Sequence, residues 1–178
     1  MTVALVGISG VGKTTFLKTA MSATPFLHLE ASKLIKEEIA LLKKQVQTSE
    51  ELRIGAIMDN QKLLVKAFRR KTVDCYDRVV LDAHTVVDTG NSLEKIPASV
   101  FLALNVKSIL FLQDDPKTIR ARREADKSRK RPQRTVDEIE HHQQMAILAA
   151  ANVALELEIS LHVITSRQAN MLAQALQV

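Results

Sequence analysis

Residues 7–14 read Gly-Ile-Ser-Gly-Val-Gly-Lys-Thr, which fills the Gly-x4-Gly-Lys-Ser/Thr pattern of a phosphate-binding P-loop. The apolar run just before it, residues 3–6, is typical of a buried parallel strand. Residues 14–21 can begin a helix, so strand, glycine-rich turn and helix N-terminus follow in the order that the motif requires. An ordinary glycine-rich turn is the alternative, and the preceding strand argues against it. The motif therefore predicts nucleotide binding.

The residue types in this motif suit an anion. Gly7, Gly10 and Gly12 tolerate positive φ, so successive N–H groups can point into one concavity at the positive end of a helix dipole. Lys13 supplies a cation for the β- and γ-phosphates, and Thr14 offers a hydroxyl to Mg²⁺. We expect ATP to be bound here by Gly7, Ser9, Gly10, Val11, Gly12, Lys13, Thr14 and Thr15.

Length and composition predict one domain. The chain has 178 residues and is 46% hydrophobic, enough for a sizeable core. Its single cysteine excludes an intramolecular disulfide, which fits a reducing cytoplasm. No stretch approaches the roughly 18 apolar residues of a membrane helix, and the N-terminal apolar run reads as a strand rather than a signal peptide.

The basic character of the chain is concentrated in one segment. Residues 117–134 hold nine Lys or Arg and only two acidic residues, so the segment is +7 and the rest of the chain is −2 of a net +5. A local anion site fits this distribution better than general nucleic-acid binding. The absence of aromatic residues after position 112 also argues against base stacking there.

Apolar runs alternate with helical patterns along the whole chain, which predicts an α/β fold with a parallel sheet. We expect a three-layer P-loop NTPase fold with an Arg-rich lid. Its five parallel strands would cover residues 2–6, 26–29, 78–82, 106–112 and 161–165. The flanking helices would cover residues 13–21, 31–44, 49–71, 97–104, 115–127, 135–158 and 167–176, with a glycine-containing loop over 84–95.

Asp82 closes the third expected strand. Ligands bind beyond the carboxyl ends of strands in open α/β sheets, so this carboxylate is a candidate for Mg²⁺ or its waters; a helix cap or surface turn is the alternative. His84 is a candidate substrate contact or, equally, a packed loop histidine.

The arginine cluster after the fourth strand suits a closing lid. Phosphoryl transfer places charge on equatorial oxygens that Arg side chains stabilise, and closure excludes water. We assign Arg123, Arg129 and Arg131 to catalysis together with Lys13 of the P-loop, and Arg122 to ATP binding, with residues 122–134 as the lid. A solvated basic helix face and a nucleic-acid patch are the alternatives.

With these residues in view, the chain resembles the nucleoside monophosphate kinases, and most closely the archaeal-type adenylate kinases. The supporting stretches are Val-Leu-Asp-Ala-His at 80–84, the Arg122-Arg123 pair, Arg129-x-Arg131, Ile-Glu-His-His-Gln at 139–143 and the Ala-rich helix at 149–154. The resemblance covers nearly the whole chain, although only the P-loop is specific by itself.

The resemblance implies reversible transfer of the ATP γ-phosphoryl group to AMP, with Mg²⁺ bridging ATP. It implies that the helical insert at residues 31–71 binds the acceptor, with Arg53 as the phosphate contact or else an exposed surface Arg. It also implies a homo-oligomer, because members of that family form trimers. The loop over 85–96 departs from the family in lacking its Gly-Pro-rich character, and the match at Arg53 is loose, which puts acceptor identity in doubt.

Other functions are less compatible with the sequence. The chain lacks the Asn/Thr-Lys-x-Asp and Asp-x-x-Gly motifs of a regulatory GTPase and the Ser-Gly-Gly signature of a transporter ATPase. Two alternatives stay open: a kinase of another small acceptor, with Asp82 as base for an alcohol, and a regulatory module that binds and slowly hydrolyses ATP. The Arg-rich segment favours transfer, because excluding water matters most when hydrolysis must be avoided.

Overall fold

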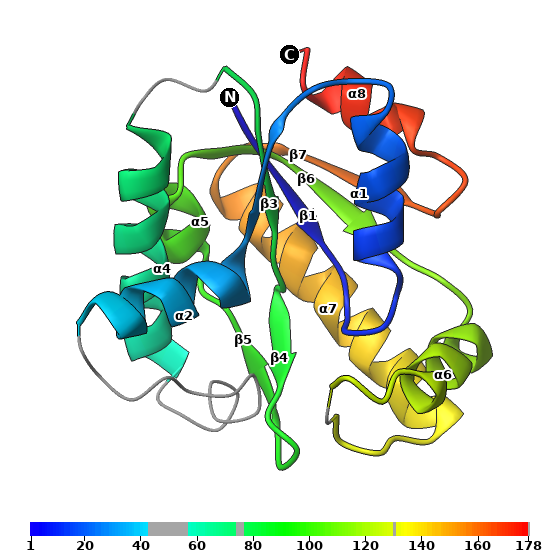
Figure 1. Cartoon of the computed structure of the whole chain (residues 1–178). Coiled ribbons are helices and arrows are strands. Elements are labelled where there is room, and N and C mark those ends of the chain that lie inside the picture. Colours follow the sequence, from blue (N-terminus) through cyan, green and yellow to red (C-terminus); the bar gives the residue numbers. More distant parts are fainter. Residues whose placement is uncertain (43–56, 74–76, 130, 178) are drawn as a thin grey trace.

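A five-stranded, all-parallel sheet forms the centre of the protein (Figure 1). The computed structural model describes residues 1–42, 57–73, 77–129 and 131–177, with side chains from 59 onward in the second of these ranges. The strand order is β2-β3-β1-β6-β7. The strands are β1 (Thr2–Val6), β2 (Leu27–Glu30), β3 (Val79–Asp82), β6 (Val106–Leu112) and β7 (Ser160–Ile164).

Helices cover both faces of this sheet, which gives the three layers of the expected fold (Figure 1). The helices α1 and α8 pack together on one side, and α5 and α7 lie behind the sheet, while α2 and α4 pack against each other beside β2 and β3. Their bounds are α1 (Lys13–Met21), α2 (Ala31–Leu41), α4 (Ile57–Thr72), α5 (Ala98–Ala103), α6 (Pro116–Ala125), α7 (Val136–Glu156) and α8 (Asn170–Ala175).

Local sequence explains where the two helices around the basic segment begin. Asp115 caps α6 by accepting a hydrogen bond from the Thr118 N–H, and Pro116 takes the first helical position, where its missing N–H costs nothing. A reciprocal capping box of Thr135 and Glu138 begins α7. The described residues between the end of α6 at Ala125 and the cap of α7 at Thr135 therefore connect two helices.

The core sits on the central strands. Residues 3–6 of β1 and 109–112 of β6 are completely buried, as their continuous apolar runs predict for strands covered on both faces. The Ala-rich face of α7, with Ala146 and Ala150 buried, allows that helix to approach the sheet closely. This rigid centre fixes the strand ends that carry the site.

The five parallel strands and their order of connection confirm the predicted fold, with ends shifted by a residue or two. The expected loop over 84–95 is wrong: β4 (Val86–Asp88) and β5 (Leu93–Lys95) form an antiparallel hairpin. Its turn is closed by Thr89–Ser92 hydrogen bonds and by Gly90 at φ 94°. The start near Ser49 that was expected for the helix over residues 49–71 lies outside the described residues.

Candidate active site

The backbone of the P-loop adopts the positive-φ conformations expected of its glycines. Gly7, Gly10 and Gly12 have φ of 153°, 87° and 106°. At Gly7 a Cβ atom would lie 2.6 Å from the Leu112 carbonyl oxygen, a backbone atom of β6 that has no room to move. The tight passage from β1 into α1 therefore requires glycine at this position.

Lys13 is the buried cation of the site, with only 7% of its surface exposed. Its Nζ donates a hydrogen bond to the Gly7 carbonyl at 2.9 Å and lies 3.6 Å from Asp82 Oδ1. Burial lowers the pKa of Lys13 and raises the pKa of Asp82, and the attraction between the two charges opposes both shifts. The carboxylates of Asp82 and Glu30 therefore offset part of the cost of burying the Lys13 ammonium.

His84 binds the same carbonyl oxygen as Lys13. Its Nδ1 lies 2.6 Å from the Gly7 oxygen, and because a carbonyl only accepts, Nδ1 carries the proton. His84 follows the end of β3 and is half-buried. The P-loop is therefore held from two sides, and His84 has a positioning contact in addition to the substrate contact expected from the sequence.

Two arginines of α6 bind the outer backbone of the P-loop. The Arg122 Nη1 donates to the Val11 carbonyl at 3.0 Å and to Asp114 at 2.6 Å. The Arg123 Nε donates to the Ser9 carbonyl at 2.8 Å. These contacts explain why α6, more than 100 residues away in sequence, lies against the P-loop.

The basic turn, described at residues 126–129 and 131–132, brings two more arginines over the same loop. Arg131 donates from Nε to Ser9 Oγ at 3.1 Å and pairs with Asp126 at 2.5 Å, and its side chain is only 9% exposed. Its Nη1 is buried without a hydrogen-bond partner among the described residues. Arg129 lies farther out, 3.7 Å from Glu30 Oε1.

Glu30 is a site residue that the sequence analysis missed. It ends β2 and is the register partner of Asp82, which ends the neighbouring β3. Its charge acts on both Lys13 and Asp82. The signal was present in the sequence: an acidic residue at the end of the second strand must lie at the same sheet edge as the acidic residue that ends the third.

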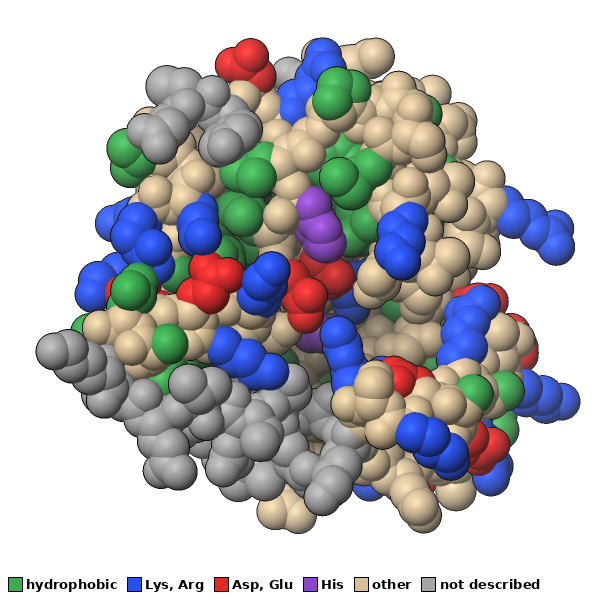
Figure 2. Space-filling view, in the orientation of Figure 1, with side chains coloured by type: hydrophobic (Ala, Val, Ile, Leu, Met, Phe, Trp, Pro, Cys, Tyr) green, Lys and Arg blue, Asp and Glu red, His purple; other side chains and the backbone are tan. Residues whose placement is uncertain are grey.

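Two cavities open at this edge of the sheet. The polar cavity, about 360 Å³, is lined by Lys13, Thr14, Glu30, Asp82 and Arg122 among others. The apolar cavity, about 150 Å³, lies between α2, α4 and β4 and is lined largely by aliphatic side chains and Phe101. Both are lined by Ser9, Ala31, Ser32, His84, Arg129 and Arg131. Figure 2 shows Lys and Arg side chains on both sides of a hollow that holds acidic and histidine side chains.

The candidate residues divide between the two cavities. Arg122 lines the polar cavity and Arg123 the apolar one, whereas Arg129 and Arg131 line both. Three of the residues assigned to ATP binding fall outside the linings. Gly7 and Val11 offer their carbonyls to Lys13 and Arg122, and Thr15 is exposed on α1. Arg53 lies outside the described residues.

A polar cavity over a P-loop, which shares a wall of basic side chains with a second cavity, is the arrangement that a P-loop kinase needs. The family model described as "AAA domain" matches residues 6–140. Adenylate kinase of Pyrobaculum aerophilum is 27% identical over 94% of this chain and 85% of its own length. Adenylate kinase of Pyrococcus horikoshii is 29% identical over 97% of this chain and 90% of its own length. Adenylate kinase of Methanococcus aeolicus is 30% identical over 83% of this chain and 80% of its own length.

Solved structures agree on the fold. Shikimate kinase from Bacteroides thetaiotaomicron superimposes with a TM-score of 0.53 at 16% identity, over 99% of this chain and 94% of that one. The chain belongs to the AAA-domain P-loop family and, within it, to the nucleoside monophosphate kinases that resemble archaeal adenylate kinase. It is accordingly an ATP-using phosphotransferase. No helix in the described residues is long and apolar enough to span a membrane.

Proposed function

We propose that this enzyme transfers the γ-phosphoryl group of ATP to the α-phosphate of AMP. The observation that supports the proposal is that the polar cavity over the P-loop and the apolar cavity share a wall that contains His84, Arg129 and Arg131. A donor phosphate on one side and an acceptor phosphate on the other would meet beneath these cations. Adenylate kinase relatives support AMP as the acceptor.

On the donor side, the P-loop N–H groups would bind the ATP phosphates and Lys13 would neutralise the β/γ charge. Lys13 sits on the Gly7 carbonyl in the free protein and would exchange this weak partner for phosphate oxygen. Negative charge that grows on the transferred group would remain within reach of the Lys13 ammonium, so the interaction strengthens toward the transition state.

The arginines would act on the group in transfer. Arg131 and Arg129 line both cavities. Their guanidinium groups would therefore stabilise the charge that develops between donor and acceptor. Arg123 would act from the acceptor side and Arg122 from the ATP side. We include closure of residues 122–134 over bound nucleotide as a lid in this proposal, because closure excludes the water that would otherwise hydrolyse ATP.

The oxygen ligands present fit Mg²⁺. Asp82 and Glu30 are adjacent carboxylates at the strand ends, and Thr14 presents an exposed hydroxyl in the same polar cavity. Hard oxygen donors with room for several waters are what Mg²⁺ prefers. Thr14 and Asp82 would hold the ion or its waters, with Glu30 beside them. Bound Mg²⁺ would neutralise phosphate charge.

On the acceptor side, the aliphatic wall of the apolar cavity suits a nucleobase and the shared arginines suit its phosphate. His84 would contact the acceptor from the shared wall. We assign Arg53 and the insert at residues 31–71 to the acceptor phosphate, by resemblance alone. We also propose a single domain over residues 1–178, a cytoplasmic location and a homo-oligomer. Light scattering after gel filtration tests the oligomeric state.

A coupled ADP-release assay with ATP, Mg²⁺ and a panel of nucleoside monophosphates tests the proposal, with an acceptor-free control. We expect AMP to raise ADP formation far above the control. If a different monophosphate gives the highest rate of ADP formation, the proposed mechanism stands and that nucleotide replaces AMP as the acceptor. If no monophosphate raises the rate, nucleotide transfer fails, and a kinase of a metabolite alcohol or an ATP-driven regulatory module takes its place.

A further inference from the structure

His142 is a buried histidine that the donor-side chemistry does not use. It lies on α7, is only 3% exposed and lines the apolar cavity. Neither ring nitrogen makes a hydrogen bond of acceptable geometry among the described residues, although the Val86 backbone is near enough to favour the protonated ring. Buried polar atoms are nearly always paired in native proteins, so two unpaired atoms on one ring need an explanation.

A purely structural role does not supply that explanation. The next residue, Gln143, shows what a satisfied polar side chain on this helix looks like. Its Nε2 donates to the Asp114 carbonyl at 3.0 Å and its Oε1 accepts from the Asp114 N–H at 3.2 Å. The fold therefore pairs Gln143 completely, whereas it leaves the ring of His142 at a cavity wall.

The surroundings keep the imidazole neutral. Burial, followed by the positive charge of Arg123, lowers the pKa of His142 to about 4; the Arg134 charge acts in the same direction, while the Asp88 carboxylate and the Val86 backbone oppose it. At neutral pH the ring consequently offers one N–H donor and one lone pair, and no charge. Such a group matches a neutral polar partner rather than a phosphate.

The cavity around it is shaped for an apolar ring with a polar edge. Buried Val86, Ile96 and Phe101 give it an apolar lining near α5 and the hairpin. Asp88 and Arg123 also line it, whereas Arg129 and Arg131 belong to the wall shared with the polar cavity. A nucleoside monophosphate whose phosphate lies at the shared wall would place its base among the aliphatic side chains.

We propose that His142 is a specificity-determining residue that hydrogen-bonds the polar edge of the acceptor nucleobase. This inference rests on the proposed nucleotide transfer and deepens it, since it names the part of the acceptor that the inner cavity reads. Pairing with a bound base would satisfy a ring atom that is unpaired in the free protein. A site that offers a buried hydrogen bond discriminates strongly against ligands that cannot complete it.

Kinetics of matched variants test this inference. His142→Phe keeps the ring shape and removes both nitrogens, and His142→Asn restores hydrogen bonding. The exposed neighbour His141 provides the controls His141→Phe and His141→Asn. We expect His142→Phe to lower kcat/KM for AMP about tenfold or more, which corresponds to about 1.4 kcal/mol. The ratio of kcat/KM for AMP to kcat/KM for the other monophosphates should fall as well. KM for ATP should change less than about twofold. His142→Asn should recover part of the loss.

Nitrogen NMR of the unmodified protein provides a second test. It needs no variant, so a folding defect cannot affect its result. With ¹⁵N-labelled histidine, we expect the His142 ring resonances to move on addition of AMP and to stay in place with inorganic phosphate. Suppose that the protein is an active AMP kinase but its His142 resonances do not move when AMP is added, or that His142→Phe loses affinity for ATP and AMP equally. Either result would overturn the role of His142 and leave the proposed function standing.

The wild-type assay separates this failure from that of the proposed function. If another monophosphate replaces AMP as acceptor, that nucleotide is the probe in both tests and the same outcomes decide. If the unmodified protein uses no monophosphate, both the proposed function and the role of His142 are wrong.

Discussion

Arg131 Nε donates a hydrogen bond to Ser9 Oγ over 3.1 Å, across 122 positions of the chain. The contact joins the basic turn to the P-loop. The same guanidinium pairs with Asp126 and is almost buried, so its position is set before a nucleotide arrives. Preorganised charge of this kind costs no reorganisation at the moment of reaction.

Replacing this residue conservatively should therefore damage catalysis. Lysine keeps the charge of Arg131 but loses the planar fork that reaches Ser9, Asp126 and the cavities together. We expect Arg131→Lys to lower kcat on the order of 10²-fold in the AMP-dependent assay, with an unchanged melting temperature.

The control for this prediction is Arg120→Lys. Arg120 lies on α6 in an exposed pair with Glu124, so its replacement should leave kcat within about twofold. Ser9→Ala removes only the hydroxyl that accepts from Arg131, so its kcat should lie between those of Arg131→Lys and Arg120→Lys. Full activity of Arg131→Lys would show that the arginine is a structural contact.

Lys13→Met should abolish most of the transfer for an electrostatic reason. The methionine side chain fills the same buried space but leaves the phosphates without their cation. We expect kcat to fall about 10²- to 10³-fold, whether or not ATP still binds. Measured ATP affinity in the same variant separates binding from turnover. Lys18→Met, an exposed position on the same helix, is the matched control and should behave like the wild type.

Asp82→Asn should change the dependence on Mg²⁺. The substitution removes one of the two adjacent carboxylates, so half-maximal activity should need about tenfold more Mg²⁺, as expected for the loss of a charged oxygen ligand. A titration of initial rate against free Mg²⁺ measures the shift. Glu30→Gln should give a smaller shift in the same direction, and the exposed control Asp59→Asn none. An unshifted Asp82→Asn curve would remove Asp82 from the metal site.

The P-loop and the parallel sheet were predictable from sequence because each depends on short-range patterns. Gly7 and Lys13 sit at fixed spacing, and continuous apolar runs mark strands that are buried on both faces. The hairpin was missed because its strands are only three residues long and its turn, around Gly90, reads as an ordinary loop.

The site beyond the P-loop depends on contacts that no spacing records. Arg123 and Ser9 meet only because α6 packs against the P-loop, and His142 belongs to the apolar cavity only because α7 crosses behind β4. Of the arginines that the sequence placed together, Arg122 lines only the polar cavity and Arg123 only the apolar one, while Arg129 and Arg131 line both. Glu30 is the exception, since strand order alone would have placed it beside Asp82.

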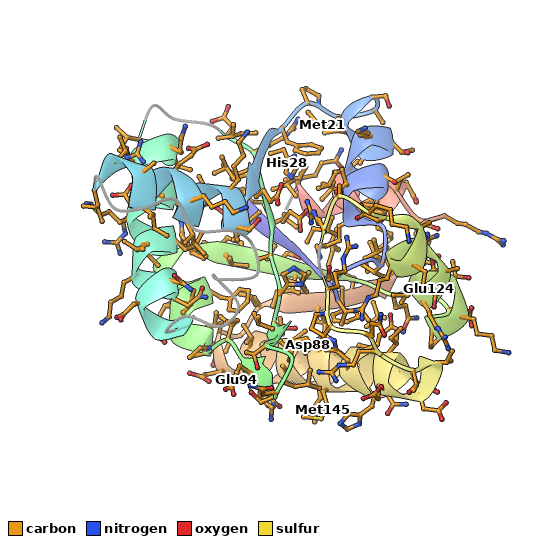
Figure 3. The ribbon with its side chains drawn as sticks, turned by 60° about the horizontal axis from the view of Figure 1, so that its bottom comes forward. Met21, His28, Asp88, Glu94, Glu124 and Met145 are labelled. Atoms are coloured by element: carbon orange, nitrogen blue, oxygen red, sulfur yellow. The ribbon has the colours of Figure 1, made fainter. Side chains whose placement is uncertain are left out.

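An ion pair helps to hold the hairpin against the start of α7. Arg134, just before α7, donates to both carboxylate oxygens of Asp88 at 2.9 and 3.1 Å and to the Gly90 carbonyl at 2.8 Å. Figure 3 shows Asp88 beside α7, on the side of the hairpin that meets the helix. Burial raises the pKa of Asp88, but hydrogen bonds from Arg134 and from the Gly90 N–H outweigh it, and the net pKa is lowered.

A lowered carboxyl pKa fixes the sign of the pH dependence. Because folded Asp88 titrates below its ordinary value of 3.8, its contribution to stability is complete above that value and disappears as pH falls through the folded pKa. We expect Arg134→Met to lower the free energy of unfolding by about 1.5–3 kcal/mol at pH 7, measured by urea denaturation. The difference from the wild type should shrink below pH 4 as Asp88 is protonated. Arg120→Met, which breaks an exposed pair instead, should cost less than about 0.5 kcal/mol. An Arg134→Met deficit that is the same at pH 7 and in acid would mean that packing of the Arg134 stem, rather than its charge, holds the hairpin against α7.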